Sequence, residues 1–266
     1  MNAPLHSEAL SVARITKTLG LEEQASTSQV MHAFARLIDQ TNLNPALGEN
    51  SFIQWAQQNA HKNFATLCVP PFLVPEAHAA TQSCPTRVCS TVGFPHGNTT
   101  IKANCTMTQE LIEAGAREID LVMNVGEFVE GHYGYVYDAI TRVINAGKEQ
   151  AAALNLEEEL TFKVIIETAL LTDEHIEQAT ELIANTGANF IKTSTGFGSR
   201  GVSLNDIEII KAHAPAELGI KASGGIATLE QALDLIDTGA TRLGTSRGLK
   251  LLEELDYILH HAERHQ

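Results

Sequence analysis

Eight short runs rich in β-branched and aromatic residues recur along the chain, and stretches with helical periodicity separate them. The runs cover residues 37–43, 64–69, 87–94, 118–124, 162–168, 190–196, 219–225 and 241–246. Regular alternation of strands and helices is typical of a parallel sheet in which each helix returns the chain to the same edge. No other feature of the sequence constrains the fold as strongly.

Eight such units within about 230 residues have the size of a (β/α)8 barrel. A doubly wound sheet would prefer a GxGxxG fingerprint after its first strand, and LIDQTNLNPALG (37–48) has none. We therefore predict an α/β fold, a TIM barrel that forms a single domain over residues 1–266. Residues 1–30 are expected to form an amino-terminal helical segment.

The helical stretches carry recognisable ends. Asn50 or Ser51 can cap SFIQWAQQNAHK, and Thr172 or Asp173 can cap TDEHIEQATELIANTG. At three junctions a helix closes on a glycine before the next strand begins, namely Gly115, Gly187 and Gly239. This weak internal repetition fits one helix-to-strand unit used several times.

The chain is acidic, with Asp+Glu 32, Lys+Arg 18 and a formal net charge of −14. Such an excess repels nucleic acid and anionic membrane surfaces, so neither is expected as a partner. An anionic small substrate remains compatible with this charge, because a few local cations can outweigh the global field.

Other features point to a cytoplasmic protein without a metal. No stretch approaches the roughly 18 apolar residues of a membrane span, and the first residues lack a secretory signal pattern. The cysteines show no CxxC or zinc spacing and the histidines no HExxH cluster, so reduced thiols and no metal site are expected. Apolar helix faces are compatible with a homodimer.

Two lysines occupy matching places in FIKTSTG (190–196) and GIKASGG (219–225). Side chains alternate along a strand, so Ile191 and Ile220 should pack against helices while Lys192 and Lys221 point into the barrel. One such lysine alone would be as readily explained by a structural ion pair as by a catalytic role. Two on adjacent strands, which lie roughly 4.8 Å apart, place like charges together.

Like charge and desolvation both disfavour protonation, so at least one of the two pKa values should fall. Each pKa unit corresponds to about 1.4 kcal/mol, and a fall of ~3 units makes a neutral amine common near pH 7. A neutral amine is the nucleophile that Schiff-base chemistry needs. The pair therefore predicts a lysine that forms an imine with a carbonyl substrate.

Asp120, within EIDLVMN (118–124), is the candidate for proton transfer in imine chemistry. It shares a predicted strand face with Val122 and Asn124. A carboxylate there can also simply neutralise the lysines. Glu167 and Lys163 are weaker candidates, and Glu118 should lie nearer the opposite end of the barrel.

Three consecutive strand ends carry glycine with hydroxyl residues: STG (194–196), SGG (223–225) and GTSRG (244–248). Glycine lets backbone N–H groups approach an anion, and TIM barrels often bind phosphate in the loops after strands seven and eight. A helix follows GTSRG, and its amino terminus would favour an anion. Together these ends predict a phosphate site beside the lysines.

FIKTSTGFG, GIKASGGI, EIDLVMNVG, KVIIET, STVGFPHG and LIDQT together resemble the deoxyribose-phosphate aldolase family from about residue 35 to 248. The resemblance implies a metal-free class I aldolase, with no cofactor, that acts in deoxyribonucleoside catabolism. Such an enzyme reversibly cleaves 2-deoxy-D-ribose 5-phosphate to acetaldehyde and D-glyceraldehyde 3-phosphate.

The resemblance also implies roles for individual residues. Lys192 would form the Schiff base, Lys221 would lower its pKa and Asp120 would transfer protons. The implied substrate-binding residues are Asp39, Thr41, Cys68 and Thr195, although Cys68 also reads as a small core residue. The implied phosphate-binding residues are Gly196, Gly224, Gly225, Ser246 and Arg247.

The chain departs from the family pattern at three places. Asn42-Leu43 follows DQT where many relatives have a leucine pair, and Arg247 stands where a second serine is usual. Arg247 can strengthen anion binding or point to solvent. Some relatives end in a tyrosine that reaches the site, whereas this chain ends ERHQ.

Two other readings stay open on the sequence alone. One is another phosphate-binding lysine barrel, such as a transaldolase-like enzyme or a sugar-phosphate isomerase. The other is a sugar-phosphate binder that keeps the scaffold without turnover.

Overall fold

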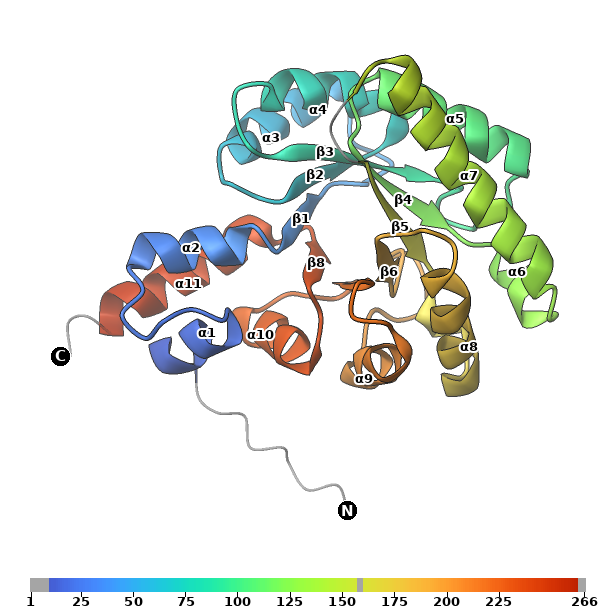
Figure 1. Cartoon of the computed structure of the whole chain (residues 1–266). Helices are drawn as coiled ribbons and strands as arrows, with labels where there is room; N and C mark the ends of the chain where they lie inside the picture. The colour runs from blue at the N-terminus through green and yellow to red at the C-terminus, as the bar shows by residue number, and fades with distance from the viewer. Residues whose placement is uncertain (1–9, 157–159, 263–266) are drawn as a thin grey trace.

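Eight parallel strands close into a barrel in the computed structural model, which describes residues 10–156 and 160–262 (Figure 1). Each strand pairs with its neighbours in chain order, and β8 closes the ring against β1. The strands are β1 Ile38–Thr41, β2 Thr66–Val69, β3 Arg87–Val92, β4 Glu118–Val122, β5 Thr161–Ile165, β6 Phe190–Lys192, β7 Gly219–Ser223 and β8 Arg242–Thr245. The predicted (β/α)8 TIM barrel is confirmed.

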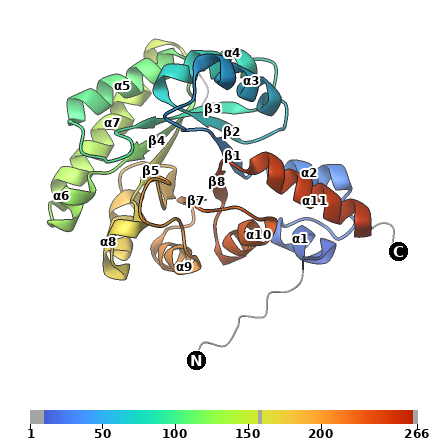
Figure 2. The ribbon, with the colours of Figure 1, turned by 180° about the vertical axis from the view of Figure 1, so that it is seen from behind.

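Helices surround the barrel on its outside, as both views show (Figures 1 and 2). They are α1 Val12–Thr18, α2 Thr27–Ala35, α3 Glu49–Ala60, α4 Val74–Thr81, α5 Ile101–Glu113, α6 Val125–Val129, α7 Tyr133–Ala153, α8 Asp173–Ala184, α9 Leu204–His213, α10 Leu229–Thr238 and α11 Gly248–Ala262. Two 3-10 turns, η1 Pro71–Leu73 and η2 Thr168–Leu170, follow β2 and β5. A continuous layer of buried apolar side chains joins strands to helices.

Seven of the eight strands end earlier than predicted, and only β2 ends where expected, at Val69. The predicted run 190–196 leaves the sheet after Lys192, and 162–168 leaves it after Ile165. Glycines with positive φ mark this departure: Gly93 follows β3 at φ 65° and Gly196 follows β6 at φ 87°. The left-handed backbone of these glycines turns the chain within the loops that follow the strands.

Helix ends partly agree with the sequence. The Thr172 side chain caps α8 by accepting from the backbone N–H of His175, and the junction glycines 115, 187 and 239 all have positive φ, as the repeated unit requires. The predicted cap of α3 is wrong, because the helix begins two or three residues earlier, at Glu49. Its N-cap is Gly48, which places Asn50 and Ser51 inside the first turn.

The predicted amino-terminal helical segment corresponds to α1 and α2, which pack beside α10 and α11 (Figure 1). Arg14 of α1 contacts Asp234 at 2.5 Å and Asp237 at 3.2 Å on α10. Phe34 of α2 is fully buried in the apolar layer. Residues 1–9 and the terminal ERHQ (263–266) lie outside the described residues.

Among residues 10–156 and 160–262, no helix combines the length and the apolarity that crossing a membrane requires.

Gly147 lies inside α7, where the helix packs closely on the sheet. A Cβ at this position would lie 2.5 Å from Cζ of Phe162 and 3.1 Å from Cδ1 of Ile112. Because neither neighbour has room to retreat, Gly147→Ala is expected to destabilise the fold by about 1–3 kcal/mol despite alanine's higher helix propensity.

Gly134, exposed at the start of the same helix, is the matched control. A Cβ there meets no heavy atom within 4 Å, so Gly134→Ala should change stability by less than about 1 kcal/mol. Urea unfolding followed by circular dichroism measures both variants. Equal stability of the two variants would contradict the tight α7–β5 contact.

Candidate active site

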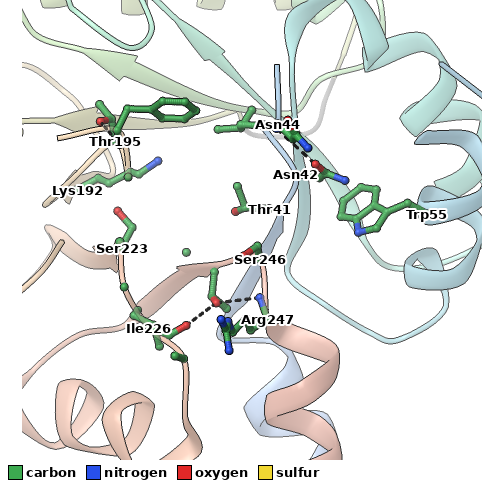
Figure 3. A pocket seen from close by; sticks show the side chains of 18 residues that line it. Thr41, Asn42, Asn44, Trp55, Lys192, Thr195, Ser223, Ile226, Ser246 and Arg247 are labelled. Atoms are coloured by element: carbon green, nitrogen blue, oxygen red, sulfur yellow. Dashed lines mark hydrogen bonds between the residues drawn. The ribbon is translucent and has the colours of Figure 1, made fainter. Parts of the chain in front are cut away.

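A cavity of about 590 Å³ opens at the carboxyl ends of the strands, where TIM barrels carry their chemistry (Figure 3). Residues from the ends of β1, β6, β7 and β8 line it, and Trp55 of α3 lies on the far side from Lys192. Among its lining residues the only charged side chains are Lys192 and Arg247. The cavity is therefore locally cationic, although the whole chain carries a net charge of −14.

Lys192 and Lys221 lie side by side at the floor of this cavity. Their Cα atoms are direct partners across β6 and β7, and Ile191 and Ile220 point outward, as the alternation predicts. Both Nζ atoms contact the same oxygen, Oδ2 of Asp120, each at 2.7 Å. Lys192 is 3% exposed and lines the cavity, whereas Lys221 is fully buried beneath it.

Two further cations extend this lysine pair into a buried network. Lys163 of β5 contacts Glu118 at 2.7 Å, Asp120 at 2.9 Å and Asp39 at 3.6 Å. Arg242 of β8 contacts Asp39 at 2.6 Å and Glu118 at 3.0 Å. Asp39 also contacts Lys221 at 2.5 Å. The charged cluster thus consists of Lys163, Lys192, Lys221, Arg242, Asp39, Glu118 and Asp120.

The cluster determines the ionisation of its buried members. Burial alone would raise the pKa of Asp120, but the ammonium groups of Lys163, Lys192 and Lys221 hold it well below its usual range. Burial alone would lower the pKa of Lys221, but the carboxylates of Asp120 and Asp39 raise it above its usual value. Lys221 is therefore a cation and Asp120 a carboxylate at neutral pH. The fall expected for one lysine of the pair therefore does not apply to Lys221.

Asp39 and Cys68 lie below the cavity and do not line it. Asp39 is fully buried and belongs to the charged cluster. Cys68 is fully buried on β2, in register with Cys89 on β3. Both side chains therefore pack beneath the residues that line the cavity.

Cys68, Cys89 and Asp120 are close enough to form a group of possible metal ligands in the described part of the chain. The ammonium group of Lys163 lies 3.3 Å from Sγ of Cys89 and 2.9 Å from Oδ1 of Asp120. A cation of the protein thus already contacts atoms that a metal would need.

Thr41 and Thr195 both line the cavity. Thr195 donates its hydroxyl and its backbone N–H to Oε2 of Glu167, and its Oγ1 accepts from the N–H of Phe197 at 3.0 Å. Glu167 is a non-glycine residue with left-handed backbone, at φ 52°. It does not line the cavity, so this weaker candidate for proton transfer instead anchors the loop after β6.

All five predicted phosphate-binding residues line the cavity, at the side formed by the loops after β6, β7 and β8. Gly196, Gly224 and Gly225 have φ values of 87°, 88° and 81°, a conformation that side chains disfavour. A Cβ on Gly201 would lie 2.1 Å from the carbonyl oxygen of Gly224, so the loops after β6 and β7 pack backbone to backbone.

The third of these loops leads into α11. Oγ1 of Thr245 accepts from the N–H of Arg247 at 3.0 Å, and Oε1 of Gln40 accepts from the N–H of Gly248 at 2.9 Å. An anion at this helix start would therefore rely on the remaining amides and on the exposed side chains of Ser246 and Arg247.

Three of the seven members of the charged cluster, Lys163, Glu118 and Arg242, are missing from the site predicted from the sequence. Lys163 is set aside for its early place in β5, yet its Cα is paired with that of Asp120. Arg242 is the register partner of Lys221, which the alternation rule could have revealed once strand order was assumed. Asn124, considered as company for Asp120, instead caps α6 by accepting from the N–H of Glu127 at 3.2 Å.

Known proteins match this chain over nearly the whole barrel. A family model described as DeoC/LacD family aldolase matches residues 33–253. The chain is 38% identical over 221 residues to a deoxyribose-phosphate aldolase of Thermococcus kodakarensis, covering 82% of this chain and 95% of the relative. A deoxyribose-phosphate aldolase of Streptococcus mutans is 36% identical over 216 residues, with 81% and 94% covered.

Solved structures agree with these sequence matches. The aldolase QR15 superposes with a TM-score of 0.78 at 32% identity, covering 86% of this chain and 98% of that one. The deoxyribose phosphate aldolase of Aeropyrum pernix, described as a unique tetramer, gives 0.77 at 25% identity, with 91% and 95% covered. Since sequence and structure match across all eight strands, the chain belongs to the DeoC/LacD aldolase family, alongside the deoxyribose-phosphate aldolases.

Proposed function

We propose that this protein is a class I aldolase that reversibly cleaves 2-deoxy-D-ribose 5-phosphate to acetaldehyde and D-glyceraldehyde 3-phosphate. One observation carries the proposal. Lys192 is the lysine of the charged cluster that opens onto the cavity, and its Nζ shares an Asp120 oxygen with the cation Lys221. An amine held beside a buried ammonium group is suited to nucleophilic attack on a carbonyl.

The reaction begins when neutral Lys192 attacks the aldehyde carbon of the open-chain sugar phosphate. The carbinolamine loses water and becomes an iminium. The C3 hydroxyl then loses its proton, the C2–C3 bond breaks, and its electron pair moves into the iminium to give an enamine. D-glyceraldehyde 3-phosphate leaves, the enamine is protonated on carbon, and hydrolysis releases acetaldehyde from Lys192.

Asp120 moves the protons in this scheme. It is fully buried and does not line the cavity, so a water molecule would have to connect its carboxylate with the substrate. Asp39 holds Lys221 and Arg242 in place. Thr41 and Thr195 offer hydroxyl groups to the sugar, and Cys68 supports the cavity floor.

The phosphate of the substrate occupies the opposite part of the cavity in this proposal. The backbone N–H groups near Gly196, Gly224 and Gly225 and the side chains of Ser246 and Arg247 bind it. The cationic guanidinium of Arg247 contributes a charge-assisted contact where relatives usually carry a serine.

We further propose that the enzyme acts in the cytoplasm as a homodimer. Tyr133 and Tyr137, one turn apart on α7, are 38% and 40% exposed, which supports a partner on that face. A monomer mass in light scattering would contradict the dimer.

Borohydride reduction in the presence of acetaldehyde is the direct test of the Schiff base. The reduction converts an imine into a stable ethyl-lysine, which peptide mass spectrometry locates. The label is expected on Lys192, because it is the cluster lysine that lines the cavity. Lys221→Leu should reduce trapping and turnover by about 100-fold or more, since it removes the adjacent cation.

Lys250, exposed on α11 and paired with Glu254 at 3.5 Å, is an internal control that should stay unlabelled. A label elsewhere, or none, would contradict the role of Lys192. Imine formation without cleavage of deoxyribose 5-phosphate would favour a transaldolase-like enzyme. Binding of the sugar phosphate with neither imine nor cleavage would favour a non-catalytic binder.

Arg247→Ser tests the phosphate site by restoring the usual family residue. Loss of a charge-assisted hydrogen bond is expected to raise KM for deoxyribose 5-phosphate about 10- to 100-fold. Activity on unphosphorylated deoxyribose should stay the same, because that substrate lacks the anion. Lys250→Ala removes a charge from the same helix outside the cavity and should change neither constant. An equal effect of Arg247→Ser on both substrates would argue against phosphate contact.

A further inference from the structure

We propose that Arg242 and Glu118, at the amino ends of their strands and away from the cavity, set how readily Lys192 gives up its proton. Neither residue lines the cavity, and both act as positioning residues through the charged cluster. The inference rests on the proposed function only in assigning Lys192 as the nucleophile. It assigns a role in the aldolase site to residues at the amino-terminal end of the barrel, opposite the cavity.

Two chains of ion pairs connect Arg242 with Lys192. One runs through Asp39, Lys221 and Asp120, with contacts of 2.6, 2.5, 2.7 and 2.7 Å in order. The other runs through Glu118, Lys163 and Asp120, with contacts of 3.0, 2.7, 2.9 and 2.7 Å. Both chains end on the carboxylate that touches Lys192.

The charges of this cluster do not balance. It holds four basic groups, from Lys163, Lys192, Lys221 and Arg242, against three carboxylates, from Asp39, Glu118 and Asp120. The side chain of Arg242 is 14% exposed, and the others are 4% exposed or less. One surplus positive charge is therefore buried, which is unfavourable in a medium of low dielectric.

Other titratable groups also face the cluster. Burial raises the pKa of Cys89 on β3 well above its usual value, whereas the hydrogen bond with Cys89 lowers the pKa of Cys68 on β2. Cys68 is fully buried, so a thiolate there would have to form in a medium of low dielectric and without access to water. Glu167, beyond β5, accepts two hydrogen bonds from Thr195 through Oε2 and makes no ion pair with the cluster lysines among the described residues. Release of one proton from a lysine is the simplest way to bring the cluster to neutrality.

Lys192 is the lysine placed to release that proton. Lys163 contacts three carboxylates and Lys221 contacts two, and these contacts raise the pKa of both lysines. Lys192 contacts a single carboxylate, Asp120, which it shares with the other two lysines. It also borders the cavity, where a released proton can reach water. Arg242, whose guanidinium keeps its proton, supplies the surplus charge.

Two substitutions should move the protonation of Lys192 in opposite directions. Arg242→Gln removes the surplus charge, so the neutral amine should appear at a pH about one unit higher than in the unmodified protein. Glu118→Gln adds a second surplus charge, so the neutral amine should appear about one unit lower. Arg242→Lys keeps the charge and should leave the profile in place.

The measurement is the initial rate of cyanoborohydride trapping of acetaldehyde on Lys192, followed by mass spectrometry between about pH 5 and pH 9. A shift of one unit corresponds to an approximately tenfold change in trapping rate on the rising limb. Structural damage alone would lower the maximum trapping rate. It would not shift the pH–rate profiles of the two variants in opposite directions. Circular dichroism checks that each variant is folded.

Unshifted limbs, or limbs that shift in the same direction, would overturn the inference. If Arg242→Gln does not fold, the shift of Glu118→Gln to lower pH decides alone. If the unmodified protein traps no acetaldehyde on Lys192, both this inference and the proposed function are contradicted. If the unmodified protein traps acetaldehyde on Lys192 but does not cleave deoxyribose 5-phosphate, only the proposed function is contradicted.

Discussion

One carboxylate shared by three lysine side chains organises the interior of this barrel. Asp120 contacts Lys163 through Oδ1 and both Lys192 and Lys221 through Oδ2. Three buried lysines would repel one another without it, and a buried carboxylate would be strongly disfavoured without them. The four side chains come from β4, β5, β6 and β7, so their mutual contacts depend on the closed register of the barrel. Chemistry and fold are therefore coupled at this point: loss of one partner leaves the others with uncompensated charge.

The site divides into a rigid and an adaptable part. The charged cluster lies on strands, whose ladder hydrogen bonds fix each side chain, as precise imine chemistry requires. The proposed phosphate site lies instead on loops after β6, β7 and β8, where positive φ values expose backbone N–H groups. Glu167 joins the two parts, because it follows β5 and accepts two hydrogen bonds from Thr195 in the loop after β6. The spacing between nucleophile and anion site is thereby built into the strand ends.

Simple periodicity is enough to predict the barrel, the inward lysines at 192 and 221 and the strand position of Asp120. Three members of the cluster are missing from that prediction. Glu118 and Arg242 begin β4 and β8, and one sequence gives no sign that these two strands face each other across the barrel. Lys163 lies at the centre of β5, where the overlong predicted strand places it near the start. Strand ends are also mispredicted, because residues such as 193–196 have β-forming composition but leave the ladder. Local propensity does not distinguish the end of a strand from the loop that follows it. The strand ends where its hydrogen bonds to the neighbouring strands of the closed barrel end.

An enzyme with a formal charge of −14 has to attract an anionic sugar phosphate, and the arrangement of its few cations accounts for this. Carboxylates are absent from the cavity lining, and the acidic members of the cluster are covered by Lys192 and Lys221. A phosphate entering the cavity meets Arg247 and backbone N–H groups, with the nearest carboxylates already paired to cations. Field lines from distant surface acids are screened within about 10 Å by salt, whereas charges around a cavity act over a few ångströms. Local placement of charge thus outweighs the net charge, because the guanidinium of Arg247 and the backbone N–H groups of the strand-end loops lie at the cavity itself.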